Sequence, residues 1–365
     1  MNRREFLKAM VGLGGILGSS LVQGCTQNQP DLVEPTHTTD PGPIEPIPTP
    51  SPEATSTPTR IAEGSMTRVA FVKTDDRSAG VLQAIDLLGN THMNGKTIFL
   101  KPNFNSADPP PGSSHIDTLT TLIQKIQTMG ADRITIGDRS GMGNTRRVMR
   151  EKDIFRMADE LGCETVVFDE LDTNGWEKVQ IEGSHWEQGF AVARPVLEAD
   201  AVVQTCCLKT HRYGGHFTMS LKNSVGLVAR TIPGEDHDYM SELHSSPDQR
   251  LMIAEINAAY HPDLIVLDGV EAFVTGGPDK GKLAASQLVL AGTDRIAIDA
   301  VGVAVLRYFG TTSTVGQGPI FQQEQIARAV DLGLGVTVPQ DIELITGDPE
   351  SEDYAAEIWE LLVAE

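Results

Sequence analysis

Cysteine is scarce in this chain of 365 residues, which contains only four cysteines, at positions 25, 163, 206 and 207. No two of them have the Cys-x-x-Cys spacing of zinc knuckles and cysteine-bound iron–sulfur clusters, which argues against both kinds of site. The spacing gives no sign of a disulfide framework either. Cys206 and Cys207 are neighbours on a predicted strand, so we expect two buried thiols on opposite faces of a sheet rather than a redox-active disulfide.

Aromatic and basic residues are also few. Three tryptophans and five tyrosines offer no aromatic patch that would indicate a sugar or a polymer as ligand. Lysine and arginine number 29 against 50 acidic residues, and a net charge of −21 repels phosphate backbones, so no nucleic-acid partner is expected. No G-x-G-x-x-G motif follows the first predicted strand, and no Walker or G-x-S-x-G motif occurs. The sequence therefore predicts neither a nucleotide cofactor nor an α/β-hydrolase.

The first residues have the pattern of a twin-arginine export signal. Arg3 and Arg4 are followed, after one residue, by Phe6-Leu7-Lys8. The apolar stretch at 9–24 is shorter than the roughly 20 apolar residues that a membrane-spanning helix needs, and it fits the apolar region of a removable signal. We therefore predict a signal peptide at 1–24 and an extracytoplasmic location.

The signal runs into Cys25 through a short sequence that resembles a bacterial lipoprotein cleavage box. Gly24 precedes the cysteine, although Gln23 departs from the usual small residue at its position. Two outcomes stay open: lipid attachment at Cys25, with a membrane anchor, or ordinary cleavage and release. Residues 26–65 contain nine prolines, eight threonines and no aromatic residue, so we interpret 25–65 as a lipid-attachment cysteine and a disordered stalk.

Residues 66–365 alternate short apolar runs with amphipathic stretches, which predicts one large α/β domain. We expect a mostly parallel or mixed sheet covered by helices on both faces. An antiparallel hairpin is expected between residues 170 and 198. The expected strands are 68–73, 97–100, 133–137, 165–168, 201–207, 264–267, 287–290 and 342–345. The expected helices are 79–88, 119–129, 153–161, 296–309, 321–332 and one that begins at 354.

Reactive side chains recur where the predicted strands end. Open α/β sheets bind ligands outside the carboxyl ends of their strands, so we expect these side chains to share a pocket. The residues at these places are Asn103, Asp138, Lys209, His211, Asp268 and Asp294. Asp294 has a second interpretation, as the N-cap of the helix that follows it. Asp299, inside the same apolar helix, needs a partner if it is buried.

The segment 208–223 carries the highest density of such residues. Lysine that has lost its hydration can act as a base or form a Schiff base, and neutral imidazole shuttles protons or binds metals. We therefore predict Lys209, His211 and Lys222 as catalytic residues. Asn103, Asn223 and Asp294 are the predicted substrate-binding residues. A divalent metal is a candidate cofactor, with Asp138, His211 and Asp268 as its predicted ligands.

Several of these pieces, taken in order, resemble the family called domain of unknown function 362. They span Val69 to Gly310 and include Lys101-Pro102-Asn103, Leu208-Lys209-Thr210-His211, Ser220-Leu221-Lys222-Asn223, Leu267-Asp268-Gly269, Gly276-Gly277-Pro278 and Ala291-Gly292-Thr293-Asp294. Some relatives look like iron–sulfur proteins because they add a ferredoxin-type cysteine module. This chain lacks those cysteines, so that role does not carry over. The resemblance implies one domain and a shared set of polar residues, and it assigns no substrate.

Two functions stay open on this basis. The first is an extracytoplasmic enzyme that acts on a small anionic substrate, with a metal or redox group as candidate cofactor. The second is a non-catalytic, lipid-tethered protein that captures a solute or a partner. The expected partners are a small-molecule ligand and, through the lipid, a membrane. The sequence names no protein partner.

Overall fold

The computed structural model describes residues 66–89 and 92–364, which belong to one compact unit. The predicted signal peptide at 1–24 and the predicted stalk at 25–65, with Cys25, lie outside the described residues. Within the described part, no helix is both long and apolar enough to cross a lipid bilayer.

A mixed sheet of ten strands forms the centre of the unit. Its main path runs β12-β1-β11-β9-β7-β2-β3-β4, while β8 pairs with β7 and β10 pairs with β9. Neighbours from β9 to β4 are parallel, as are β12 and β1, whereas β11 is antiparallel to both β1 and β9. These strands are β1 (Thr67–Lys73), β2 (Thr97–Lys101), β3 (Arg133–Asp138), β4 (Glu164–Val167), β7 (Ala201–His211), β8 (His216–Thr218), β9 (Leu264–Gly276), β10 (Gly281–Ala284), β11 (Leu288–Gly292) and β12 (Ile342–Ile345).

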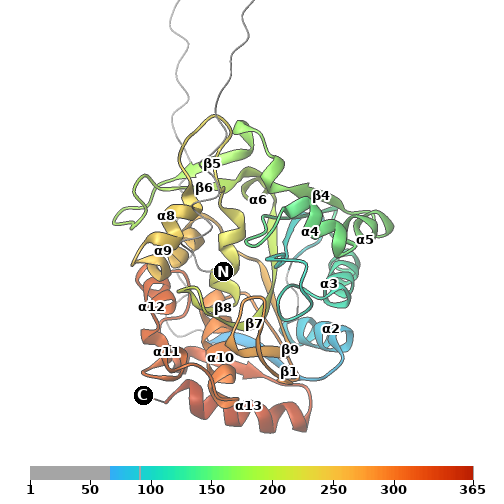
Figure 1. The fold of residues 1–365 in the computed structure, drawn as a ribbon. Helices are drawn as coiled ribbons and strands as arrows, with labels where there is room; N and C mark the ends of the chain where they lie inside the picture. Colours follow the sequence, from blue (N-terminus) through green and yellow to red (C-terminus); the bar gives the residue numbers. More distant parts are fainter. Residues whose placement is uncertain (1–65, 90–91, 365) are drawn as a thin grey trace, which may run out of the picture. The chain divides into compact units, whose positions relative to one another are not determined.

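Helices cover both faces of this sheet, which confirms the predicted α/β class. On β2, Ile98 and Leu100 enter the core under one layer of helices, and Phe99 enters the core on the opposite face. Figure 1 shows α2, α3, α4 and α5 on one side and α8, α9, α11 and α12 on the other. These helices are α2 (Arg77–Leu88), α3 (Ile116–Thr128), α4 (Thr145–Glu151), α5 (Ile154–Glu160), α8 (Tyr239–Ser245), α9 (Gln249–Ile256), α11 (Ser313–Gly316) and α12 (Glu324–Asp331).

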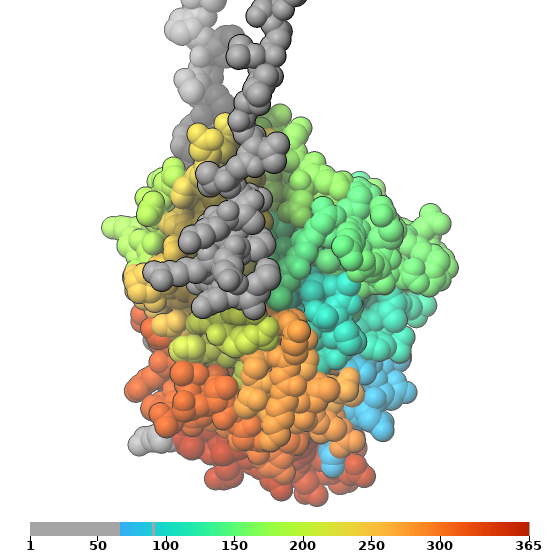
Figure 2. Space-filling view, viewed as in Figure 1, coloured from blue at the N-terminus to red at the C-terminus, as the bar shows by residue number. Residues whose placement is uncertain are grey.

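Two longer helices complete the C-terminal half of the unit. The apolar α10 (Arg295–Tyr308) packs against α13 (Pro349–Leu362) and shares the core that Phe71 and Leu267 enter from the sheet. In the space-filling view the red and orange C-terminal segments form the lower part, and the cyan and green segments that include α3, α4 and α5 lie above them on the right (Figure 2). The remaining short helices are α6 (Arg194–Glu198) and α7 (Ser220–Asn223).

The predicted hairpin is present as a small separate sheet. β5 (Trp176–Val179) and β6 (Phe190–Ala193) pair antiparallel, with Trp176 opposite Ala193. Cys206 and Cys207 are buried on β7 and carry free thiols, as expected. Burial raises the pKa of both thiols, so they are uncharged core groups.

Two strands are longer than the sequence predicted, and this changes where their polar residues lie. The run 201–207 predicted a strand that ends before Lys209, but β7 continues through His211 because β8 pairs with its last residues. The run 264–267 predicted a strand that ends at Asp268, but β9 continues to Gly276 and pairs with β10. Lys209, His211 and Asp268 are therefore strand residues rather than loop residues. Helices α4, α6, α7, α8, α9 and α11 were also missing from the prediction.

Asp294 is the N-cap of α10, which was the second of the two interpretations that its position allowed. Its Oδ1 accepts hydrogen bonds from the backbone N–H groups of Ile296 and Ala297, at 2.8 and 3.0 Å. Its Oδ2 accepts from the N–H of Val336 at 2.6 Å, so the carboxylate also fastens the segment after α12. Both oxygens are buried and occupied by backbone donors.

We therefore predict that Asp294→Ala lowers the free energy of unfolding by about 2–4 kcal/mol. Loss of an N-cap accounts for about 1 kcal/mol, and the buried N–H of Val336 loses its acceptor as well, at about 1–3 kcal/mol. Urea denaturation would measure the loss. The exposed N-cap of α2 provides the control, because Asp76→Ala removes one cap bond to Ala79 and should reduce stability by about 1 kcal/mol. Equal losses in the two variants would contradict the proposed tie to Val336.

Candidate functional site

A cavity of about 820 Å³ opens at the carboxyl ends of β7, β2 and β3, which are neighbours in the sheet. Six of the eight predicted catalytic, substrate-binding and metal-binding residues line it, namely Lys209, His211, Lys222, Asn103, Asn223 and Asp138. Asp268 and Asp294 are not among its lining residues. The strand-end argument thus places most of the predicted side chains in one pocket.

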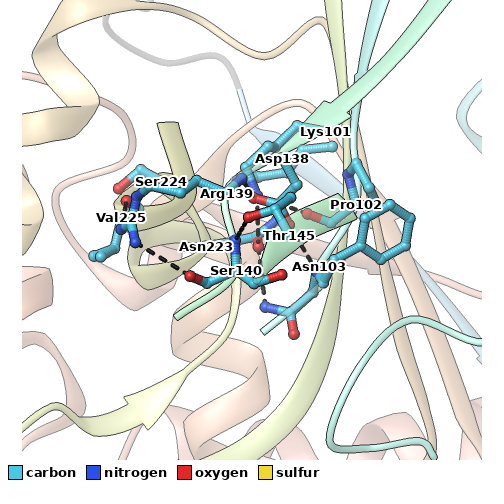
Figure 3. A network of polar contacts seen from close by, with 12 residues as sticks. Lys101, Pro102, Asn103, Asp138, Arg139, Ser140, Thr145, Asn223, Ser224 and Val225 are labelled. Carbon is cyan, nitrogen blue, oxygen red and sulfur yellow. Dashed lines mark hydrogen bonds and ion pairs between the residues drawn. The ribbon is translucent and has the colours of Figure 1, made fainter. Parts of the chain in front are cut away.

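The ends of β2 and β3 meet in a buried ion pair. Nζ of Lys101 lies 2.9 Å from Oδ1 of Asp138. The carboxylate also accepts hydrogen bonds from the backbone N–H groups of Phe104 and Arg139, each at 2.7 Å. Burial lowers the pKa of Lys101 and raises the pKa of Asp138, while the ion pair shifts both pKa values in the opposite direction. The pair is closed by its own partners, and Figure 3 shows it within the polar network.

Two asparagines connect this ion pair to β7. Oδ1 of Asn223 accepts hydrogen bonds from Nζ of Lys101 at 3.2 Å and from Nδ2 of Asn103 at 3.0 Å. Oδ1 of Asn103 in turn accepts from Nζ of Lys209 at 3.1 Å. Lys209 also donates to the carbonyl of Gly112 at 2.5 Å. One continuous chain of hydrogen bonds therefore forms the floor of the cavity across three strands.

Lys222 differs from the other two lysines because its ammonium is not engaged. It lies on α7, whose first two backbone N–H groups, those of Ser220 and Leu221, donate to the buried carboxylate of Asp299 at 2.7 and 3.1 Å. Asp299 thus finds the partners that its burial required and fixes α7 in place. The side chain of Lys222 is only 8 % exposed, and within the described residues its Nζ has no hydrogen-bond or ion-pair partner. Burial, with Lys209 and Arg139 nearby, lowers the pKa of Lys222 to about 7.

His211 borders the same space as Lys222. A Cβ placed on Gly215 would lie 2.4 Å from Cε of Lys222 and 3.2 Å from Nδ1 of His211. Both side chains therefore pack close to the backbone of Gly215. Nδ1 of His211 is buried and has no hydrogen-bond partner in the described part of the chain. Burial and the nearby charges of Lys222 and Lys209 lower the pKa of His211, which is therefore neutral.

The cavity carries positive charge that the described residues do not neutralise. Among them, Lys209, Lys222 and Arg139 have no carboxylate within ion-pair distance, although all three are buried. Arg139 donates instead to backbone carbonyls, including those of Val225 and Val228. Buried cations without counter-charges are unfavourable, so this arrangement favours an anion in the cavity.

Two residues that line the cavity have buried hydroxyl groups without partners among the described residues. Oγ of Ser140 and Oγ1 of Thr218 are buried and make no hydrogen bond to other described residues. Thr218 stands opposite Lys209 in the β7–β8 pairing, and Ser140 follows β3 directly. Together with Lys222 and His211 they give four unused polar groups around one cavity. An oxyanion is the kind of ligand that accepts several such hydrogen bonds at once.

The three predicted metal ligands, Asp138, His211 and Asp268, do not come together. Asp138 is paired with Lys101, and Asp268 lies with its carboxylate 2.9 Å from Nε of Arg77. Throughout residues 66–89 and 92–364, no group of three or more histidine, cysteine or acidic side chains is placed to hold a metal ion. Because cations and backbone donors already occupy both carboxylates, this set of residues does not fit a divalent metal.

Asp268 has a role in joining elements of the fold. Its carboxylate accepts hydrogen bonds from Arg77 on α2 and, at 2.7 Å, from Thr118 on α3. It therefore ties two helices to β9. Sequence reasoning missed Arg139, Ser140 and Thr218 as cavity residues. The first two directly follow Asp138, and this position after a strand was the available signal.

We predict that Lys222→Met stabilises the protein, and that the gain depends on pH. The pKa of Lys222 falls from 10.5 to about 7 on folding, so below pH 7 the folded state carries the full penalty of a buried charge. The penalty fades as pH rises from 7 towards 10.5. The variant should gain about 1–4 kcal/mol at pH 6, since one pKa unit corresponds to about 1.4 kcal/mol, and much less at pH 10.

Urea denaturation at both pH values would measure this gain. Lys282→Met, on the exposed β10, is the matched control and should change stability little at either pH. A gain that is the same at pH 6 and pH 10 would contradict the assigned pKa.

This chain is similar in sequence to a known protein and in structure to a solved one. It is similar to the thylakoid-associated protein sll1697 of Synechocystis sp. (strain ATCC 27184 / PCC 6803 / Kazusa), with 24 % identity over 235 residues, which cover 62 % of this chain and 68 % of that protein. Among solved structures, it is similar to the lactate racemase apoprotein from Thermoanaerobacterium thermosaccharolyticum, with a TM-score of 0.37 and 16 % identity. That match covers 63 % of this chain and 54 % of the racemase chain, and so faint a likeness carries no argument.

The family comparison is stronger, because it covers more than half of the chain. Residues 98–304 match the family described as domain of unknown function (DUF362). The matched region begins in β2 and ends in α10, so it contains every residue of the polar network between Lys101 and Asn223. It also agrees with the resemblance noted in the sequence. This chain belongs to the DUF362 family.

Proposed function

We propose that this protein is an enzyme that acts on a small anionic substrate in the cavity at the ends of β7, β2 and β3. The observation that carries the proposal is the amine of Lys222, which is buried, borders the cavity and has no partner among the described residues. A lysine kept in this state at the expense of stability is typical of a catalytic base or nucleophile.

The proposed role of each side chain follows from the hydrogen-bonding groups and the charge that its contacts within the protein leave unused. Lys101 and Lys209 donate hydrogen bonds to oxygen acceptors, which hold their side chains in place. Their proposed role is to make the electrostatic potential at the floor of the cavity positive. Ser140 and Thr218 hold unused hydroxyl groups that can donate to an oxyanion. With a pKa near 7, Lys222 exists as a mixture of ammonium and free amine, and the neutral imidazole of His211 can pass a proton between Lys222 and the bound substrate.

No metal takes part in the proposed chemistry. The sequence suggested a divalent metal or a redox group, but Asp138 and Asp268 already hold Lys101 and Arg77. The chemistry proposed here therefore uses the amine, the imidazole and the hydroxyl groups of this chain.

A second candidate function is a binding protein that holds an anion without changing it. The fully hydrogen-bonded floor formed by Lys101, Asn103, Asn223 and Lys209 favours this alternative, because a rigid receptor needs nothing more. The two functions differ in the role of His211, because only an enzyme needs a group that transfers protons. His211→Gln should preserve anion affinity under both proposals, and it should remove turnover only under the first.

We also propose that the protein is exported and attached to a membrane. The Arg3-Arg4 pattern and Cys25 support this, as does the name of the Synechocystis relative, which describes that protein as thylakoid-associated. Replacement of both arginines by lysine should retain the protein in the cytoplasm, because the twin-arginine machinery reads the arginine pair. Cell fractionation and immunoblotting would measure this. Unchanged export of the double variant would contradict the proposed signal.

Binding of simple anions tests the proposed site directly. Titration calorimetry with oxalate and with inorganic phosphate should detect binding that weakens as pH rises through about 7, because Lys222 loses its charge there. Lys222→Met should weaken binding by about tenfold or more, the equivalent of one charge-assisted hydrogen bond. Lys282→Met is the control for overall charge. Equal anion affinity in wild type and Lys222→Met would contradict the proposed function.

A further inference from the structure

We infer that Lys222 forms an imine with the carbonyl carbon of a small substrate that also carries a carboxylate, of which a 2-oxo acid is the simplest example. This inference rests on the proposed function and deepens it by naming the substrate class. It also assigns the amine the role of nucleophile.

The first argument is the contrast among the three buried lysines of the cavity. Lys101 donates to Asp138, Asn223 and the carbonyl of Pro102, and Lys209 donates to Asn103 and the carbonyl of Gly112. Burial lowers the pKa of both lysines, but these oxygen acceptors hold their amines in fixed positions and occupy their N–H groups. Lys222 has no such acceptor among the described residues, so its lone pair is accessible whenever the amine is neutral.

The second argument is space beside the amine. Gly215 faces Cε of Lys222 so closely that a Cβ there would lie 2.4 Å from it. The last carbons of Lys222 therefore occupy space that any larger side chain at position 215 would fill. Its Nζ borders a cavity of about 820 Å³, which is ample for a ligand of a few carbon atoms.

The third argument is recognition of the carboxylate. Ser140 and Thr218 line the cavity, and their hydroxyl groups are buried and have no partner among the described residues. Lys209 and Arg139 add positive charge without a carboxylate of their own. A carboxylate next to a carbonyl group satisfies both requirements, because its oxygens accept from the hydroxyl groups while the carbonyl carbon meets Lys222.

The reaction balances with groups that the cavity contains. Nζ of neutral Lys222 attacks the carbonyl carbon, and the carbonyl oxygen takes up a proton, giving a carbinolamine. Loss of the second N–H proton and departure of the hydroxyl group as water then form the C=N bond. One water molecule is released in total, and no oxidant or reductant is needed. The neutral imidazole of His211, which borders the same volume, can carry the proton to the departing hydroxyl group.

Reductive trapping tests the inference. The full-length protein is incubated at pH 7 with pyruvate and sodium cyanoborohydride, digested and analysed by peptide mass spectrometry. An imine is reduced to a stable N-carboxyethyl lysine. We expect Lys222 to carry this group at an occupancy at least about tenfold above that of exposed lysines such as Lys282, because far more of its amine is neutral at this pH. Equal labelling of Lys222 and Lys282 would overturn the inference.

The matched variant is His211→Gln, which keeps Lys222 in place. Labelling of Lys222 should slow by about tenfold or more, while labelling of Lys282 stays the same. Oxalate, which has no ketone group, separates the two proposals. If oxalate binding depends on Lys222 but pyruvate leaves no label, the imine is refuted and the proposed function stands. If neither oxalate binding nor labelling depends on Lys222, both proposals are refuted.

Discussion

The ion pair between Lys101 and Asp138 is the interaction on which the rest of the site depends. It joins the ends of two neighbouring strands, and its free hydrogen-bonding positions are taken by Asn223 and by the backbone of the loops that follow both strands. Gly226 seals it, because a Cβ there would lie 2.2 Å from the Asp138 carboxylate. Breaking a buried pair of this kind would leave an uncompensated charge in the core. The loops that follow β2 and β3 are therefore stabilised by the ion pair as well as by their own contacts.

Much of the fold could be predicted from the sequence, because hydrophobic periodicity reports on local structure. The strand at 342–345 has the predicted bounds, and the hairpin expected between 170 and 198 is present. The extra length of β7 and β9 was not predictable, since it depends on pairing with β8 and β10, which are only three and four residues long. Asp268 illustrates the same limit. Its neutralising partner, Arg77, lies 191 residues earlier in the chain, and no local pattern connects the two.

For the site, residue type and position at a strand end were informative, whereas the state of each side chain was not. The sequence treated Lys209 and Lys222 alike, as lysines beside an anionic group. In the structure one is tied to Asn103 and Gly112, and the other has no partner among the described residues. This difference arises from the placement of α7, which Asp299 fixes from a helix 79 residues further along. Only tertiary structure distinguishes a lysine that shapes a cavity from one that can react in it.

The long sequence separation within the polar network has a consequence for folding. Lys101 and Asn223 are hydrogen-bonded although their positions in the chain are 122 residues apart. Closing a loop of that length costs conformational entropy of the chain before the contact can form. We therefore expect the pocket to form late in folding, after its flanking strands have paired. A chain leaving the ribosome therefore exposes Lys101 without a cavity until β7 and α7 have been synthesised. Until α7 has packed in place, the amine of Lys222 is an ordinary hydrated ammonium, and its pKa falls only on completion of the fold.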